Sequence, residues 1–221
     1  MKTENILFDL DGTLIDSFSG IEHSARAAIA AVMPQRELPD LRRLIGPPVR
    51  EVLRRAVSEV GSEKLDELER RFRISYDTQG WRKSVPYDGV AEVLSRLCRA
   101  KLKCFVVTNK PTLPTKRILD GLRLLEYFEE VVSLDSRTPP FLSKTEAAEY
   151  LINRHRLRAP ATLFVGDSVD DARAAQSCGL RFAAVTYGYG GVHSARDFPA
   201  HITLDSMSGL TSVIEGRDDP E

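Results

Sequence analysis

Two aspartates, Asp9 and Asp11, follow the apolar residues 6–8 and precede Gly12. Side chains at alternate positions of an extended strand point to the same face, so the two carboxylates are predicted to project together while Leu10 turns toward the interior. Carboxylates this close repel each other unless a cation or a shared proton lies between them. The pair therefore predicts a metal site, a proton-sharing pair or both, and Gly12 allows a sharp turn and the close approach of a ligand.

This segment has two other possible interpretations. A polar turn whose acids cap the next helix fits an Asp-x-Asp-Gly sequence equally well, and it remains an alternative. A calcium-binding loop needs glycine at its sixth position and flanking helices. The sixth residue counted from Asp9 is Leu14, and the preceding segment is predicted to be a strand, so the calcium loop is set aside.

Further polar residues lie where other strands are predicted to end, which is the edge at which open parallel sheets bind ligands. Thr108 and Asn109 end an apolar run and offer a hydroxyl, an amide and backbone N–H groups to an anionic oxygen, although Thr-Asn also occurs in ordinary turns. Asp167 follows another such run and is predicted to face the same crevice as Asp9. Ser168 and Asp171 also fit an ordinary helix N-cap, which would explain Asp171 without a catalytic or metal-binding role.

A lysine near the start of a helix is a separate signal. Ser143 and Glu146 form a predicted capping box, which places Lys144 in the first helical turn. The helix dipole disfavours a cation there. We infer a negative charge near Lys144, while noting that exposed lysines tolerate such positions.

The elements that position these residues follow from the apolar pattern. Short apolar runs that alternate with helical patterns predict strands buried on both faces, hence an α/β fold with a Rossmann-like open parallel sheet and helices on both faces. The predicted strands are residues 6–10, 104–108, 131–134, 162–165, 182–186 and 202–204, and a closing helix is predicted at 210–214.

One segment, residues 17–84, shows only helical periodicity. A helical block placed directly after the first strand predicts an inserted α-helical cap domain on a core made of residues 1–16 and 85–221. The two connections, near Asp16 and near residues 84–86, are predicted to form a hinge.

Composition limits the possible partners. The 221 residues carry a formal net charge of -1 with mixed acids and bases, which gives no basic stripe for nucleic acid. No apolar run is long enough for a membrane span, and the first residues lack the pattern of a cleavable signal. Cys98, Cys104 and Cys178 have no metal-ligand spacing and are predicted to be reduced core thiols. We expect a cytoplasmic monomer or homodimer without nucleic-acid or membrane partners.

The chain resembles the haloacid dehalogenase-like (HAD) hydrolase superfamily in four motifs that occur in the order of that family. They are D-L-D-G-T at 9–13, T-N at 108–109, a helix-start lysine at 144 and G-D-S-x-x-D at 166–171. The helical block resembles the small cap of phosphoglycolate phosphatase-like and β-phosphoglucomutase-like members. The segments I-G-P-P at 45–48 and Y-G-Y-G at 187–190 are most similar to the phosphoglycolate phosphatase-like branch.

This resemblance implies a Mg²⁺-dependent phosphatase that acts on a small phosphorylated metabolite of the phosphoglycolate, sugar phosphate or nucleotide type. It implies that Asp9 attacks phosphorus and forms an aspartyl-phosphate, while Asp11 protonates the leaving oxygen and later accepts a proton from water. The implied Mg²⁺ ligands are Asp9, the backbone carbonyl of Asp11 and Asp167, with Asp171 farther from the ion. Carboxylates and water suit such a hard cation, and the covalent intermediate splits one hard step into two.

The resemblance also implies that Thr108 and the Asn109 backbone hold phosphoryl oxygens and that Lys144 neutralises the transferring group. Many relatives have proline after this lysine, whereas here Thr145 follows, so Lys110 remains an alternative. Retention of the second acid favours phosphate esters, because members that dehalogenate or cleave phosphonates lack it.

Two further substrate contacts are predicted. Gly12 is expected to lie against the substrate, and Arg50 is expected to meet a second anionic group when the cap closes. A solvated arginine on the helix surface is the ordinary alternative for Arg50. A phosphomutase and a non-catalytic binding or regulatory module on the same fold are the alternatives to a phosphatase.

Overall fold

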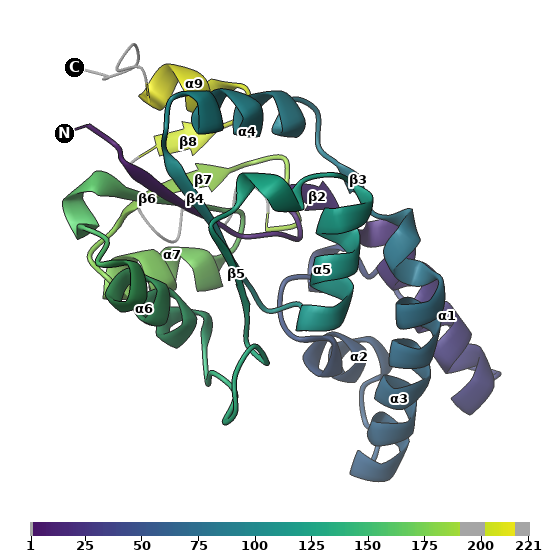
Figure 1. The fold of residues 1–221 in the computed structure, drawn as a ribbon. Helices are drawn as coiled ribbons and strands as arrows, with labels where there is room; N and C mark the ends of the chain where they lie inside the picture. Colours follow the sequence, from purple (N-terminus) through teal and green to yellow (C-terminus); the bar gives the residue numbers. More distant parts are fainter. Residues whose placement is uncertain (1, 191–201, 215–221) are drawn as a thin grey trace.

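The computed structural model describes residues 2–190 and 202–214. Within them, six parallel strands form one sheet in the order β5-β4-β1-β6-β7-β8 (Figure 1). The strands are β1 (Asn5–Phe8), β4 (Lys103–Thr108), β5 (Glu130–Ser133), β6 (Thr162–Gly166), β7 (Arg181–Val185) and β8 (Ile202–Leu204). Each predicted apolar run coincides with one of these strands to within a residue or two, so the predicted α/β fold is confirmed.

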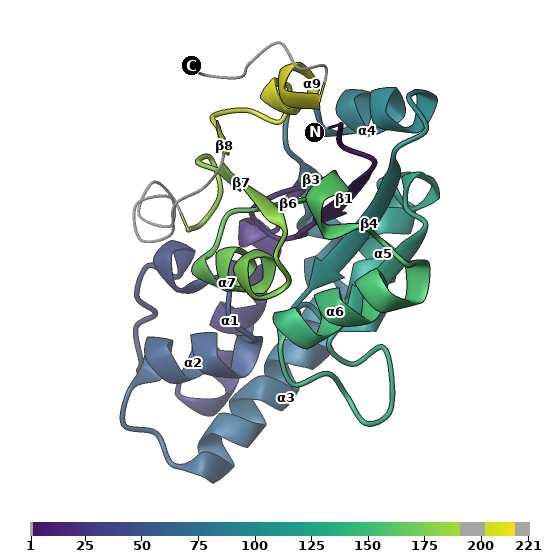
Figure 2. The ribbon, with the colours of Figure 1, turned by 90° about the vertical axis from the view of Figure 1, so that its left-hand side faces the viewer.

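Helices cover both faces of the sheet because successive strand side chains point in opposite directions. Ile6 and Phe8 of β1 pack in one hydrophobic cluster with α4, α5 and α9, whereas Leu7 packs in a second cluster with α6 and α7 (Figure 2). These helices are α4 (Val90–Arg99), α5 (Thr112–Gly121), α6 (Lys144–His155), α7 (Val169–Ser177) and α9 (Gly209–Ile214). In the described part of the chain, no helix combines the length and apolar character that a membrane crossing requires.

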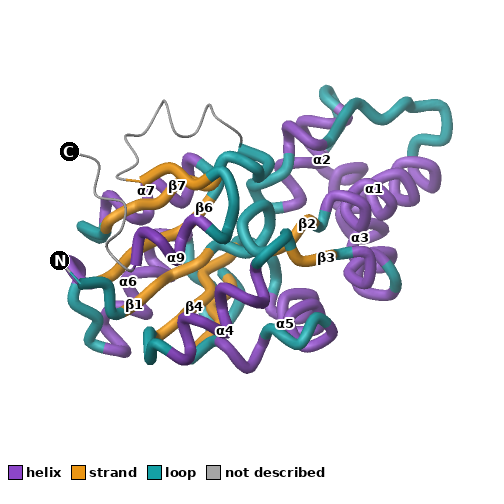
Figure 3. Tube along the Cα trace, turned by 90° about the horizontal axis from the view of Figure 1, so that it is seen from above, coloured by secondary structure: helices purple, strands orange, loops and turns teal. Residues whose placement is uncertain are grey.

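The helical block between β1 and β4 lies to one side of the sheet (Figure 3). It contains α1 (Phe18–Val32), α2 (Val49–Val57) and α3 (Ser62–Thr78). These helices bury a hydrophobic cluster of their own, centred on residues such as Ile29, Leu53 and Leu68. A block with its own core is what an inserted cap domain requires, and the boundary at 17–84 stays a prediction. Residues 191–201 and 215–221 of the predicted core lie outside the described residues.

A short antiparallel ribbon joins the helical block to the sheet. Its strands are β2 (Ile15–Asp16) and β3 (Val85–Pro86), and Ile15 pairs with Pro86. The ribbon lies at the two connections for which the sequence predicts a hinge. It holds the entry and exit of the block side by side, so the chain enters and leaves the block at one place.

The cysteines differ in their surroundings. Cys104 is buried in β4 and Cys178 is half-buried, but Cys98 is exposed. The prediction of a core position is therefore wrong for Cys98. It follows Leu97 on α4, and neighbouring helical positions face different directions, so the buried Leu97 leaves Cys98 on the outer face.

Candidate active site

The carboxyl ends of three adjacent strands meet at the site. Phe8, the last residue of β1, is in register with Val106 of β4 on one side and Val165 of β6 on the other. From β1 the chain continues to β4 and β5 on one side, and it then crosses to β6 on the other side of β1, so a crevice opens where the strand order reverses. The residues that follow each strand reach this crevice from distant parts of the sequence.

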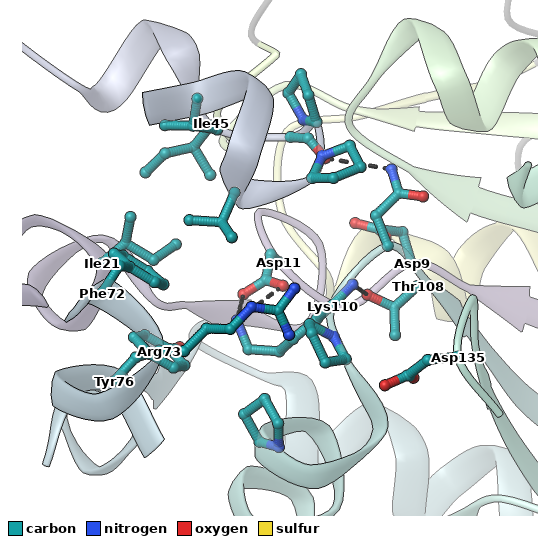
Figure 4. A pocket seen from close by; sticks show the side chains of 18 of the residues that line it. Asp9, Asp11, Ile21, Ile45, Phe72, Arg73, Tyr76, Thr108, Lys110 and Asp135 are labelled. Atoms are coloured by element: carbon teal, nitrogen blue, oxygen red, sulfur yellow. Dashed lines mark hydrogen bonds and ion pairs between the residues drawn. The ribbon is translucent and has the colours of Figure 1, made fainter. Parts of the chain in front are cut away.

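The predicted residues line one cavity of about 230 Å³ between the sheet edge and the helical block (Figure 4). Those that line it are Asp9, Asp11, Thr108, Asn109, Lys144 and Asp167, together with Lys110. Asp171 lies behind them and is fully buried. Gly12 and Arg50 are not among the described residues that line the cavity.

Three buried carboxylates form a compact cluster. Asp9, Asp167 and Asp171 each offer an oxygen, and these oxygens lie within 4.8 Å of one another. The backbone N–H groups of Tyr189 and Gly190 donate to Asp167 Oδ2 at 2.7 and 3.0 Å, which fixes the position of that carboxylate.

Lys144 supplies a positive charge to this cluster. Its Nζ lies 2.7 Å from Asp9 Oδ1 and 2.6 Å from Asp171 Oδ1, and the side chain is only 3% exposed. Burial alone lowers the pKa of the Lys144 ammonium, but the carboxylates of Asp171 and Asp9 outweigh burial and raise it above its usual value. The negative charge inferred from the helix-start position is thus supplied by two side chains of the protein.

The remaining negative charge fits a divalent cation. Burial raises the pKa of Asp9 well above its usual value although Lys144 opposes the shift, and burial together with Asp171 raises the pKa of Asp167 to about 7. One ammonium among three buried carboxylates leaves this centre short of positive charge. A donor set made of carboxylate oxygens is the one that Mg²⁺ prefers, so these residues fit the implied ion.

Asp11 lies in a neighbouring group of polar contacts. Lys110 Nζ is 2.8 Å from Asp11 Oδ1 and 3.1 Å from Oδ2, and the Ser17 hydroxyl also donates to Oδ1. Lys110 Nζ lies 4.8 Å from the ring centroid of Tyr76 on α3, a cation–π contact with the helical block. The two lysines therefore divide the two aspartates: Lys144 contacts Asp9, and Lys110 contacts Asp11.

Serine caps start both helices that bring residues to the site. Ser143 Oγ accepts the Glu146 N–H at 3.2 Å, and Ser168 Oγ accepts the Asp171 N–H at 3.3 Å. Asp171 Oδ2 completes a capping box by accepting the Ser168 N–H at 3.0 Å. Glu146 accepts instead from the Leu142 N–H, one residue before the predicted partner. Asp171 is thus both a helix cap and a partner of the buried lysine.

Thr108 and Asn109 reach the cavity with different partners. Thr108 is buried, and its Oγ1 accepts the Lys110 N–H at 3.1 Å. Asn109 Nδ2 donates to Asp170 Oδ2 at 3.0 Å and to the Gly46 carbonyl of the helical block at 3.3 Å. The Asn109 side chain therefore bridges the sheet edge and the helical block, which leaves its backbone as the group for an anion.

Gly12 and Arg50 have other partners in the structure, and their predicted substrate contacts stay predictions. The Gly12 N–H donates to the Ile15 carbonyl at 2.9 Å, and its φ is +90°. A Cβ at this position would clash with Asp167 Oδ2, so the lack of a side chain at Gly12 makes room for that carboxylate.

Arg50 forms ion pairs away from the cavity. Its Nη1 lies 2.6 Å from Asp66 Oδ1 and 2.9 Å from Glu69 Oε2 on α3. The arginine that lines the cavity is Arg73, also on α3. Helical periodicity alone cannot predict which of two arginines faces a crevice when the helices that carry them pack against each other. In this structure the packing of α2 on α3 places Arg50 next to α3.

Tyr189 is a site residue that the sequence did not indicate. Besides its N–H bond to Asp167, its hydroxyl donates to Asp16 Oδ1 at 2.8 Å and accepts the Ser17 N–H at 2.7 Å. It therefore connects the carboxylate cluster to the β2–β3 ribbon, where the sequence predicts a hinge. The Y-G-Y-G segment resembles relatives of the family, but no local sequence pattern predicts that Tyr189 contacts residues as distant in the sequence as Asp16 and Ser17.

Comparison with known proteins provides independent evidence on the family of this chain. The model of the haloacid dehalogenase-like hydrolases matches residues 6–185. A phosphoglycolate phosphatase of Aliivibrio fischeri is 30% identical and is aligned over 95% of each chain. A phosphoglycolate phosphatase of Caulobacter vibrioides is 33% identical over 83% of this chain and 79% of that protein.

Solved structures agree in fold. A predicted phosphoglycolate phosphatase from Haemophilus somnus superposes with a TM-score of 0.85 at 27% identity, covering 96% of this chain and 98% of that one. A predicted phosphatase from Clostridium acetobutylicum gives 0.86 at 26% identity, covering 98% and 100%. The similarity extends over both the sheet and the helical block.

Proposed function

This chain belongs to the haloacid dehalogenase-like hydrolase family, and from that premise we propose that it hydrolyses a small phosphorylated metabolite through an aspartyl-phosphate on Asp9, with Mg²⁺ as cofactor. Family membership and the phosphatase relatives make it a phosphoric monoester hydrolase. The observation that carries the finer proposal is the buried Lys144–Asp9 ion pair, at 2.7 Å, beside two more carboxylates at the wall of the cavity.

Contacts to both oxygens fix the orientation of the Asp9 carboxylate, as nucleophilic attack requires. Lys144 binds Oδ1, and the Thr13 hydroxyl lies 3.4 Å from Oδ2. In the first step an Asp9 oxygen forms a bond to phosphorus, and the ester P–O bond breaks. Asp11 gives its proton to the leaving oxygen, so the alcohol departs neutral.

In the second step water attacks the phosphorus of the aspartyl-phosphate, and Asp11 takes the proton that water loses. The Asp9 carboxylate is regenerated, and inorganic phosphate is released. Lys110 and Ser17 hold the Asp11 carboxylate in place for both transfers. The proton that Asp11 takes from water replaces the one it gave to the leaving oxygen, so the site is ready for the next turnover.

The charge of the transferring phosphoryl group needs fixed positive partners. Lys144 supplies one, and the Thr108 hydroxyl and the Asn109 N–H supply donors at the sheet edge. Asp9, Asp167 and the Asp11 carbonyl would hold Mg²⁺, which when bound neutralises phosphoryl oxygens. Asp171 orients Lys144 through their 2.6 Å contact.

The helical block is proposed to act as a cap over residues 17–84. It moves about the β2–β3 ribbon and excludes water when it closes. A cytoplasmic location and a monomeric or homodimeric state stay predictions.

The test is phosphate release from a panel of phosphate monoesters, with and without Mg²⁺. Asp9→Asn is expected to abolish release while the circular dichroism spectrum and melting temperature show a folded protein. Asp120→Asn, at an exposed position on α5, is the matched control and should keep full activity. Release by Asp9→Asn comparable to the native rate would refute the nucleophile. Isomerised phosphate ester without free phosphate would identify a mutase.

A further inference from the structure

The cavity has two chemically different sides. Figure 4 shows Asp9 and Thr108 on one side, opposite Ile21, Ile45 and Phe72 of the helical block. Apolar side chains on the helical side of the cavity include Ile21, Ile45, Val49, Val52, Phe72 and Tyr76. The phosphoryl group must lie at the sheet edge with Asp9, so the rest of the substrate lies against this apolar wall.

The wall contains apolar surface that core packing does not require. Ile45 is only half-buried, and it belongs to none of the three hydrophobic clusters of the described residues. Leu113, which lines the cavity from α5, is 50% exposed. Phe72 and Tyr76 differ from these two residues, because they belong to the buried cluster of the helical block and stack there with ring centroids 5.4 Å apart. Apolar side chains that line a ligand cavity without serving a core indicate an apolar ligand surface.

The charged side chains on the helical side of the cavity offer little stabilisation to a second anionic group of the substrate. Among the described residues that line the cavity, the helical block contributes Arg73 and Asp77 as its charged side chains. Arg73 Nη2 is already paired with Glu69 Oε1 at 2.7 Å. Glu69 already neutralises part of the Arg73 charge, and a substrate carboxylate bound at this arginine would also lie near the Asp77 carboxylate, which repels it.

We infer that the leaving group of the substrate is an uncharged, apolar or aromatic alcohol, and that an anion such as the glycolate of the relatives' named substrate is disfavoured. This inference rests on the proposed phosphatase function and names its substrate class. Ile45 and Leu113 are the side chains that set the preference.

The test compares alkyl phosphates whose ester bonds are alike in reactivity. Rates of phosphate release are measured with Mg²⁺ for benzyl phosphate, methyl phosphate and phosphoglycolate. The expected kcat/KM for benzyl phosphate exceeds each of the others by about tenfold or more, the range that apolar pocket contacts provide. A higher kcat/KM for phosphoglycolate overturns the inference and leaves the phosphatase function intact. Absence of release from all three and from a broad ester panel would instead refute the function.

Two variants test the assigned residues. Ile45→Ser and Leu113→Ser are expected to lower the ratio of kcat/KM between benzyl and methyl phosphate by about threefold to tenfold. The matched controls are Ile74→Ser and Leu142→Ser, because Ile74 and Leu142 are exposed and neither side chain lines the cavity. Their ratio should equal that of the native protein. An unchanged ratio in both cavity variants overturns the assignment, and Leu113, being half-exposed, provides a variant that folds if Ile45→Ser does not.

Discussion

At the scale of single residues, the two lysines of the site have separate tasks. Lys144 compensates Asp9 and Asp171 in the buried cluster, whereas Lys110 contacts Asp11 and the ring of Tyr76. Both are buried, so neither is a surface cation that happens to lie nearby. The sequence left open which lysine serves the nucleophile, and the contact distances favour Lys144.

This separation predicts a large effect of Lys144→Ala. Removing the ammonium leaves two carboxylates buried without their partner, and the free energy of unfolding should fall by about 3–5 kcal/mol in metal-free protein. Turnover should be lost as well, because the phosphoryl charge loses a fixed partner. Urea denaturation in the presence of a chelator measures the first effect, and phosphate release measures the second.

The control for this variant is Lys116→Ala, at an exposed position on α5. It should change stability by no more than about 0.5 kcal/mol. If Lys144→Ala unfolded at the native urea concentration and still released phosphate, the assignment of Lys144 to the nucleophile would be wrong.

At the scale of elements, the hinge ribbon is connected to the carboxylate cluster by one loop. The Tyr189 N–H fixes Asp167, and the Tyr189 hydroxyl binds Asp16 of β2 and the backbone of Ser17. Ser17 in turn donates to Asp11. The start of the helical block is therefore tied both to Asp167, a proposed Mg²⁺ ligand, and to Asp11, the proposed acid and base.

Tyr189→Phe is predicted to loosen the hinge without disturbing the carboxylates. The variant keeps the backbone bond to Asp167 but loses the hydroxyl bonds, each worth about 1 kcal/mol. Hydrogen exchange should become faster at residues 15–17, and Mg²⁺ affinity should stay unchanged. Tyr127→Phe, whose ring packs on the cluster beside the sheet, is the control. Native exchange at 15–17 in Tyr189→Phe would show that the loop does not hold the ribbon.

The contrast between Asp167 and Tyr189 explains what the sequence can predict here. Strands appear as short apolar runs, and polar residues directly after them project at the sheet edge, so Asp9, Thr108 and Asp167 could be assigned from local pattern. Tyr189 and Ser17 have no such pattern, because their roles come from a contact that forms only after the sheet is assembled. The ion pairs of Arg50 cannot be predicted from the sequence for a related reason, since helix packing decides which face of α2 meets α3.

At the scale of the whole molecule, the site gathers negative charge at the centre of the fold. Carboxylates from β1 and from β6 and α7 are buried together, and the only ammonium that contacts them among the described residues is Lys144. Burying like charges costs stability unless a cation joins them. The stability of the entire chain should therefore depend on pH and on Mg²⁺ together.

The sign of this dependence follows from Asp167, whose pKa is raised from 3.8 to about 7 by burial and by Asp171. Between these two pH values the folded chain holds a proton that the unfolded chain has lost, so this group's contribution to the free energy of unfolding decreases as pH rises and levels off above about pH 7. Burial shifts the pKa of Asp9 in the same direction. Mg²⁺ binds the ionised carboxylates, so its stabilising effect should increase over the same interval.

Melting temperatures of the metal-free protein at about pH 5 and about pH 8, each with and without added Mg²⁺, measure both dependences. The increase on adding Mg²⁺ should be larger at the higher pH. Asp167→Asn removes a titrating ligand and should flatten the pH dependence of the metal-free protein while reducing the Mg²⁺ effect, whereas Asp120→Asn should alter neither. An Mg²⁺ effect that is equal at both pH values, or that survives in full in Asp167→Asn, would mean that the ion binds away from this cluster.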